Sequence, residues 1–113
     1  MKLPSEAFLL RIFIGESDRV GGRPLHEVVV EEARKRGMSG ATVLRGFLGF
    51  GANSRIHTTK VLRLSEDLPV VVEIVDSEQK VEAFLPELDT LIGEGLVTLE
   101  KVRVIAYRHN SRG

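Results

Sequence analysis

The stretch Ala7-Phe-Leu-Leu-Arg-Ile-Phe-Ile14 is apolar at every position except Arg11. An apolar run of this length, with turn residues after it, predicts a buried β-strand. Because neighbouring side chains of a strand point to opposite faces of its sheet, Leu9 and Phe13 share one face and the even-numbered residues of 8–14 share the other. Both faces of this strand therefore need to be covered.

The same two-sided pattern recurs in Pro69-Val-Val-Val-Glu-Ile-Val75, which predicts another strand of this kind. This strand has a possible extension through residues 60–64, and further strands are expected over 41–48 and 96–107. If helices cover only one face of the sheet, the other face presents a large apolar patch. We therefore expect an obligate oligomer. The alternative is that the outward side chains are ordinary exposed surface.

An amphipathic helix is expected from Pro24 to Arg36, because proline suits a first helical turn and Gly37 is a natural terminator. A second helix is expected to begin at Asp76, which with Gln79 resembles a capping box. This helix should end at residues 93–95. Pro86 falls inside its apolar pattern and removes one backbone hydrogen bond, so we expect a kink there or a helix broken in two.

The expected order is strand, helix, strand, strand, helix, strand, which is the split βαβ arrangement (βαββαβ). The predicted fold class is α+β and ferredoxin-like, with both helices on one face of a four-stranded antiparallel sheet. The 113 residues are expected to form one domain, 1–113, whose tail at 110–113 frays.

Composition narrows the class of partner. Sixteen basic residues balance sixteen acidic ones, so no broad positive field exists to hold nucleic acid or an anionic membrane. No apolar stretch approaches the ~20 residues of a membrane span, and residues 1–6 lack the apolar segment of a secretion signal. We therefore expect a cytoplasmic protein. The excess of arginine over lysine and the scarcity of amides lean toward a thermophile as the source.

Glycines are dense in Arg45-Gly-Phe-Leu-Gly-Phe-Gly51, which together with 52–59 predicts a loop. Glycine lets a ligand approach the main chain, so Gly49 and Gly51 could direct N–H groups at an anion such as phosphate. The alternative is a glycine-rich turn without a ligand. Gly93-Glu-Gly95 has the same two interpretations, a second backbone anion cradle or a bare helix stop.

Three arginines lie in or after expected strands and could pair bidentately with a phosphate or a carboxylate: Arg45, Arg103 and Arg108. Structural salt bridges are the alternative use for each of them. The sequence contains neither the lysine-serine or lysine-threonine ending of a P-loop nor the third glycine of a dinucleotide fingerprint.

The histidines give little sign of catalysis. His26 is expected to point to solvent from the first helical turn, and His109 belongs to the polar tail. His57, in the glycine loop, could bind phosphate, coordinate a metal or act as an acid or base, and a plain polar surface role is the alternative. No His-x-x-x-His, paired-carboxylate or nucleophile-elbow spacing occurs, and no cysteine is present. We do not expect an enzyme.

Several short segments form a pattern along the chain: GESD at 15–18, GRPL at 22–25, GATV at 40–43, RG at 45–46, GFG at 49–51, IHT at 56–58, LPV at 68–70 and GLVT at 95–98. By this pattern the chain resembles the PII-like proteins, and most closely a small uncharacterised prokaryotic family, domain of unknown function one-ninety. The resemblance covers nearly the whole chain. It implies a ferredoxin-like fold and a PII-like trimer, with the sheets facing inward and the loop after the second strand projecting outward.

The resemblance also implies a nucleotide site. In PII proteins an adenine nucleotide sits in each cleft between subunits, and the residues of this chain that match its contacts are Gly49, Phe50, Gly51, Gly93, Gly95, Arg103 and Arg108. Leu96 stands where PII proteins place a lysine for the nucleotide phosphates, which favours AMP or ADP over ATP. Asn53 does not take over the role of the PII loop glutamine, because the spacing needs a one-residue insertion.

The function expected from this resemblance is signalling by a cytoplasmic homotrimer. Ligand bound between subunits would order the loop at 49–59, which then contacts a target protein, with a membrane transporter as one candidate. No cofactor is required in this scheme. Two alternatives remain: a metal-binding trimer like the CutA proteins, with His57 as the candidate ligand, and a small enzyme using the sheet cleft.

Overall fold

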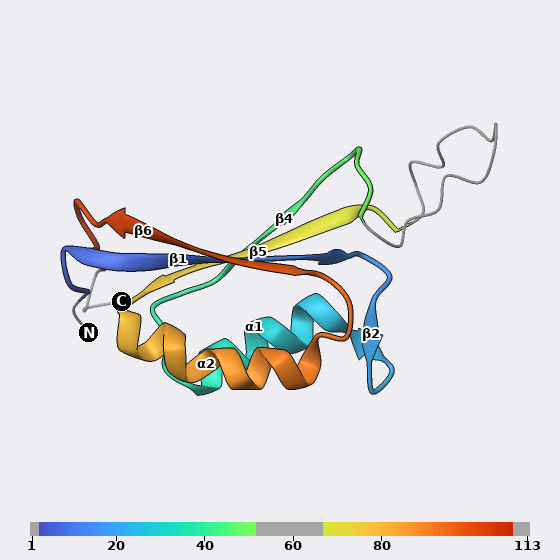
Figure 1. Ribbon diagram of the computed structural model, residues 1–113, viewed down its shortest axis with the longest axis horizontal. Coiled ribbons are helices and arrows are strands. Elements are labelled where there is room, and N and C mark those ends of the chain that lie inside the picture. The colour runs from blue at the N-terminus through green and yellow to red at the C-terminus, as the bar shows by residue number, and fades with distance from the viewer. Residues whose placement is uncertain (1–2, 52–66, 110–113) are drawn as a thin grey trace.

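The computed structural model describes residues 3–51 and 67–109 (Figure 1). Its main sheet has four antiparallel strands in the order β4-β5-β1-β6. These strands are β1 (Glu6–Gly15), β4 (Thr42–Arg45), β5 (Pro69–Asp76) and β6 (Leu96–Arg103). The helices α1 (Leu25–Lys35) and α2 (Glu78–Leu91) both lie on one face of this sheet (Figure 1). The expected α+β, split βαβ fold is thus confirmed.

The core lies between the helices and the sheet. It takes every second residue of the two central strands, and those residues are at most 6% exposed: Leu10, Ile12 and Ile14 from β1, and Val70, Val72 and Ile74 from β5. Phe84 and Leu88 of α2 and Val29 and Ala33 of α1 meet them from the helical layer. The alternation predicted for residues 8–14 therefore decides which side chains enter this core.

Two strands are shorter than expected, and one hairpin was not expected. β4 covers only 42–45 of the predicted 41–48, and β6 ends at Arg103 instead of residue 107. A small hairpin of β2 (Arg19–Val20) and β3 (Arg23–Pro24) lies between β1 and α1, where the sequence predicted no strand. Gly21 and Gly22 turn it with φ of 58° and 80°, which is the left-handed backbone that a two-residue hairpin turn requires. The extension expected at 60–64 lies outside the described residues.

α2 differs from expectation at two points. It runs without interruption from Glu78 to Leu91, so of the two outcomes expected at Pro86, a kink or a helix broken in two, the break does not occur. Pro86 and Glu82, whose carbonyl loses its usual partner, are both exposed, and water can replace the missing bond. The predicted cap is also wrong, because Asp76 still pairs with Phe8 in the sheet. The true N-cap is Ser77, whose hydroxyl accepts a hydrogen bond from Lys80 N at 3.3 Å.

Replacing Ser77 with alanine should destabilise the protein by about 1 kcal/mol, because the N–H of Lys80 loses its acceptor. Urea unfolding followed by circular dichroism measures this change. Ser77→Asp restores an acceptor at the same position and should recover the lost stability. An alanine variant as stable as the parent would mean that this cap contributes nothing.

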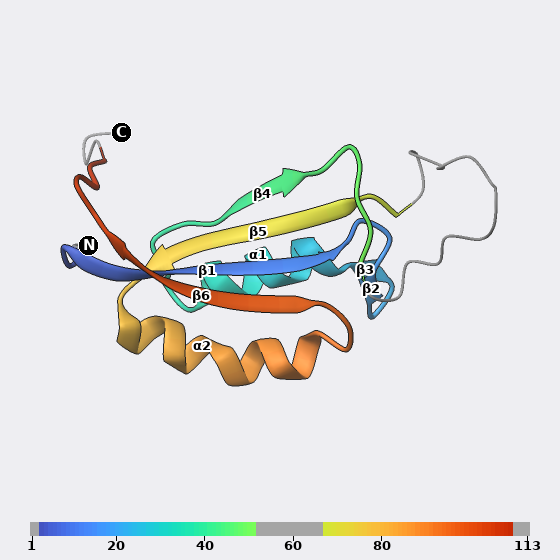
Figure 2. The same cartoon turned by 45° about the horizontal axis from the view of Figure 1, so that its top comes forward.

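No described helix covers the second face of the sheet (Figure 2). One row across this face is apolar and consists of Leu44, Val71, Phe13 and Leu96, one residue from each strand. The next row holds Arg11, whose guanidinium donates to Glu73 at 3.0 Å and to Glu100 at 3.1 Å. Leu44 and Leu96 are about half exposed, at 49% and 56%. This surface, called the open face below, is the unpaired apolar patch that the sequence predicted.

No helix in the ranges 3–51 and 67–109 is long and apolar enough to cross a membrane.

Candidate functional site

The glycine segments lie together at one end of the sheet, called the glycine end below. Gly49 follows β4 and approaches Pro69, the first residue of β5. Gly95 precedes β6, where a side-chain carbon would come within 2.7 Å of the carbonyl oxygen of Phe13. Its φ of 152° adds to that constraint, so only glycine fits there. Gly15, at the end of β1, pairs with Pro69, which places both segments at the same end of the sheet.

Two of the three predicted arginines lie at the other end of the sheet, whereas Arg45 lies at the glycine end. Arg103 is the last residue of β6 and pairs with Glu6 at the start of β1, and Arg108 follows it in the chain. At about 3.3 Å per residue, β6 places roughly 20 Å between its two ends. The two halves of the predicted nucleotide site are therefore not brought together within one protomer.

The three arginines have different surroundings. Arg45 forms a salt bridge with Glu16, at 3.0 Å between Nε and Oε2. This contact matches the structural salt bridge that the sequence allowed as the alternative to anion binding. Arg103 and Arg108 have no hydrogen-bond or ion-pair partner among residues 3–51 and 67–109. Both are exposed, so their charges are available to an anion from outside the protomer.

A pocket of about 600 Å³ opens beside Arg103 and is called the C-terminal pocket below. It lies between the loop that follows α1, the open face of β5 and the segment after β6. Its lining is mostly apolar with a few polar groups, the usual character of a small-molecule site. The residues that line it are Leu3, Leu9, Ser39, Gly40, Ala41, Thr42, Glu73, Val75, Val102, Arg103, Val104, Ile105, Ala106 and Tyr107.

Hydrogen bonds fix the walls of the C-terminal pocket. The hydroxyl of Tyr107 donates to the carbonyl oxygen of Ser39 at 2.7 Å, and the N–H of Ser39 donates to Asp76 Oδ2 at 2.8 Å. Lys80 Nζ donates to the carbonyl of Gly37 at 2.8 Å. The α1–β4 loop is thus held from β5, from α2 and from the C-terminal segment. Asp76 is 2% exposed, which makes it the buried anchor of this arrangement.

Of the residues that line the C-terminal pocket, the sequence predicted only Arg103 as a site residue. The others were missed because the pocket needs residues 104–107 to leave the sheet and cross toward Ser39, whereas the sequence predicts strand through 107. Tyr107 is the only tyrosine of the chain. Its position among apolar residues near the C-terminus was the one feature of the sequence that could have indicated a role for Tyr107.

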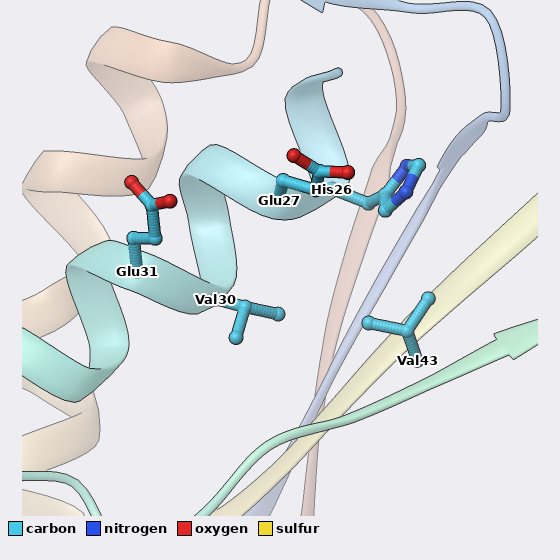
Figure 3. A pocket seen from close by; sticks show the side chains of 5 residues that line it. All are labelled: His26, Glu27, Val30, Glu31 and Val43. Atoms are coloured by element: carbon cyan, nitrogen blue, oxygen red, sulfur yellow. The ribbon is translucent and has the colours of Figure 1, made fainter. Parts of the chain in front are cut away.

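A smaller pocket of about 320 Å³ lies between α1 and β4, where His26, Val30 and Val43 face one gap (Figure 3). His26 is half-buried and its Nδ1 is buried without a hydrogen-bond partner, so the expectation that it points to solvent is wrong. Glu31 is held by Arg23, with contacts of 2.5 and 2.8 Å, and this pairing lowers the pKa of Glu31. No group of three or more metal-ligating side chains occurs in the described part of the chain.

Large apolar side chains are exposed where the glycine loop begins. Phe47, Leu48 and Phe50 are 81%, 56% and 74% exposed. Residues 52–66, which include His57 and most of the loop at 49–59, lie outside the described residues. The roles expected of that loop and of His57 therefore stay predictions, as does the frayed tail at 110–113.

Proteins of similar sequence place this chain in a known family. The model of the DUF190 family ("Uncharacterized ACR, COG1993") matches residues 7–104, so the chain belongs to this family. A UPF0166 protein of Aquifex aeolicus is 44% identical over 97 residues, covering 86% of this chain and 91% of that protein.

Solved structures share the fold at low sequence identity. A protein of Thermus thermophilus described as PII-like superposes with a TM-score of 0.63 at 20% identity, covering 88% of this chain and 90% of that one. CPII of Thiomonas intermedia, bound to ADP and bicarbonate, superposes with a TM-score of 0.57 at 17% identity, covering 88% of each chain. Another structure of CPII holds ADP, AMP and bicarbonate. The fold of this chain is therefore that of the PII-like proteins.

Proposed function

We propose that this protein is a PII-like regulatory protein rather than an enzyme. In this proposal residues 1–113 form one PII-like domain that assembles as a cytoplasmic homotrimer. A small adenine nucleotide, AMP or ADP, binds in the clefts between subunits, and the loop at 49–59 contacts a target protein. Membership of the DUF190 family and the PII-like fold support the regulatory role.

One observation supports the intersubunit site: the glycine end and the end that carries Arg103 and Arg108 are opposite ends of the same sheet. A small ligand reaches Gly49–Gly51, Gly93 and Gly95 together with Arg103 and Arg108 only if these come from two copies. A head-to-tail contact of this kind closes into a ring when the rotation permits. The open face supplies the apolar surface that such a ring would bury.

The two ends suit different parts of a nucleotide. The backbone N–H groups around Gly49–Gly51 and Gly93–Gly95 suit the phosphates. The mostly apolar C-terminal pocket beside Arg103 suits a base and ribose. Leu96 follows Gly95 and adds no positive charge, so a monophosphate or diphosphate matches the site better than ATP. The adenine nucleotides held by CPII support this choice of ligand.

Thermal unfolding with AMP, ADP or ATP, and separately with divalent cations, tests the proposal. AMP and ADP should raise the melting temperature more than ATP, because Leu96 adds no positive charge for a third phosphate. A ligand at 100 times its Kd stabilises the folded state by about 2.7 kcal/mol. Stabilisation by metal ions alone would contradict the nucleotide site and favour a CutA-like metal-binding trimer. Mass spectrometry of any small molecule that co-purifies with the oligomer gives an independent identification.

Gly51→Val should abolish the nucleotide-induced stabilisation, since a branched side chain blocks approach to the backbone. An added carbon at Gly51 meets no atom of residues 3–51 and 67–109 within 4 Å, so the variant protein should still fold. His57→Ala serves as its matched control and should leave the stabilisation intact. The converse pair of results would assign binding to the imidazole and overturn the backbone cradle.

A further inference from the structure

The ring of Tyr107 forms part of the wall of the C-terminal pocket and is 39% exposed. Its hydroxyl donates to the carbonyl of Ser39 at 2.7 Å, so one edge of the ring is fixed to the α1–β4 loop. The remaining lining offers aliphatic side chains but no second aromatic ring. Among the described residues that line this pocket, Tyr107 is therefore the one that carries an aromatic ring.

The surroundings of Tyr107 suit a ligand with a planar ring and a negative charge. Arg103 lines the same pocket and has no ion-pair or hydrogen-bond partner within the described residues. Glu73, on the floor of the pocket, already accepts a hydrogen bond from Arg11 Nε at 3.0 Å, which offsets its negative charge. An anionic ligand near Arg103 consequently meets an unpaired cation. The charge of Glu73 is offset only in part, because Arg11 also donates to Glu100 at 3.1 Å.

We propose that Tyr107 is the base-stacking residue of this protein and sets its preference for nucleotides over ribose phosphates of equal charge. This inference rests on the proposed nucleotide-binding function and assigns its base to the C-terminal pocket. Stacking on an aromatic ring is effective for any base, because every base has a π-face. The bond from Tyr107 to Ser39 holds the ring in place before the ligand arrives.

The position of Tyr107 also explains why the C-terminal segment leaves the sheet after Arg103. The N–H of Val104 bonds to the carbonyl of Ser5 at 2.7 Å, and Tyr107 bonds to Ser39. These two bonds anchor the segment at both ends, so Ile105 and Ala106 between them pass along the pocket. A strand that continued straight through residue 107, as the sequence predicted, would carry Tyr107 away from Ser39.

Binding of AMP to the intact protein tests the inference through intrinsic fluorescence. Tyr107 is the only tyrosine and the chain contains no tryptophan, so the tyrosine emission reports on this residue alone. Stacking of a purine should quench that emission, whereas ribose 5-phosphate should leave it unchanged. Calorimetry of the same titrations gives the affinities without relying on the fluorophore.

Two variants distinguish the contribution of the Tyr107 ring to binding from that of its hydroxyl group. Tyr107→Ala should weaken AMP binding roughly 10-fold to 100-fold, as expected for the loss of a base–aromatic stack, and leave ribose 5-phosphate binding unchanged. Tyr107→Phe keeps the ring and loses only the bond to Ser39, so it should weaken AMP binding less than about fivefold. Circular dichroism confirms that both variants fold.

The outcomes distinguish this inference from the proposed function. If the parent protein binds AMP with quenching and Tyr107→Ala loses affinity for AMP alone, the stacking role stands. Equal affinities of the parent and Tyr107→Ala for AMP would overturn the stacking role and leave the nucleotide site in place. A parent protein that binds no adenine nucleotide would overturn both.

Discussion

Replacing Phe13 with glutamate should convert the proposed trimer into folded monomers that bind no AMP. Phe13 lies in the middle of the apolar row of the open face, between Val71 and Leu96. Phe13 is already partly buried in the protomer, so its further burial contributes less than the roughly 1.5–3 kcal/mol of a fully exposed side chain, and this contribution is lost in each of three protomers. A loss of about 1.4 kcal/mol per protomer, tenfold each, lowers the association constant of the trimer about a thousandfold. The buried negative charge lowers it further.

Sedimentation at micromolar concentration measures this effect, and circular dichroism shows whether the fold survives. The side chain faces away from the helices, so the core of Leu10, Ile12 and Phe84 is untouched and the monomer should retain its secondary structure. Phe13→Leu is the matched control, because it keeps an apolar group in the row and should remain trimeric. A parent protein that sediments as a well-folded monomer would refute the assembly, and with it the intersubunit site.

The sheet could be predicted from the sequence because its evidence is local. Nearly continuous apolar runs in 7–14 and 69–75 define two central strands, and the helical periodicity of 24–36 and 76–92 defines the layer that covers one face. The strand ends were less accurate. β4 ends early because Gly46 makes the last backbone bond to Pro69, after which the chain turns away. A pattern of side chains carries no signal for such an ending.

The errors around α2 have a common physical cause, which is competition between a local motif and a tertiary contact. Asp76 and Gln79 have the spacing of a capping box, yet the sheet retains Asp76, and the helix begins later with Ser77 as its cap. Pro86 is a helix breaker by propensity, but the carbonyl that it leaves unpaired belongs to an exposed residue, and the helix packs through Phe84 and Leu88. In both cases packing decides the outcome.

Only half of the candidate site had a sequence signal. The glycines and Arg103 were identified by the resemblance to PII-like proteins, and the structure places them at two ends of one sheet. The C-terminal pocket had no such signal, because its key contact joins Ser39 to Tyr107 across 68 positions of the chain. A contact of that separation depends on the complete fold, so it became visible only in the structure.

Asp76 links the fold to the C-terminal pocket most directly, because its side chain contacts elements of both. Its side chain is 2% exposed and accepts the N–H of Ser39 at 2.8 Å and that of Ser77 at 2.7 Å. The hydroxyl of Ser39 donates to the carbonyl of Val75 in the same region. One buried carboxyl group therefore fixes both the start of α2 and the loop that lines the C-terminal pocket.

Asp76→Ala should destabilise the protein by about 2–5 kcal/mol, because two partly buried N–H groups lose their acceptor and no water easily reaches them. It should also weaken AMP binding, since Ser39 then loses one of the bonds that hold the pocket wall. Urea unfolding and calorimetry measure the two effects. Asp76→Asn retains one acceptor oxygen and should fall between the parent and the alanine variant in both. An Asp76→Ala protein that unfolds at the urea concentration of an exposed control, Asp89→Ala, would show that this carboxyl group anchors neither element.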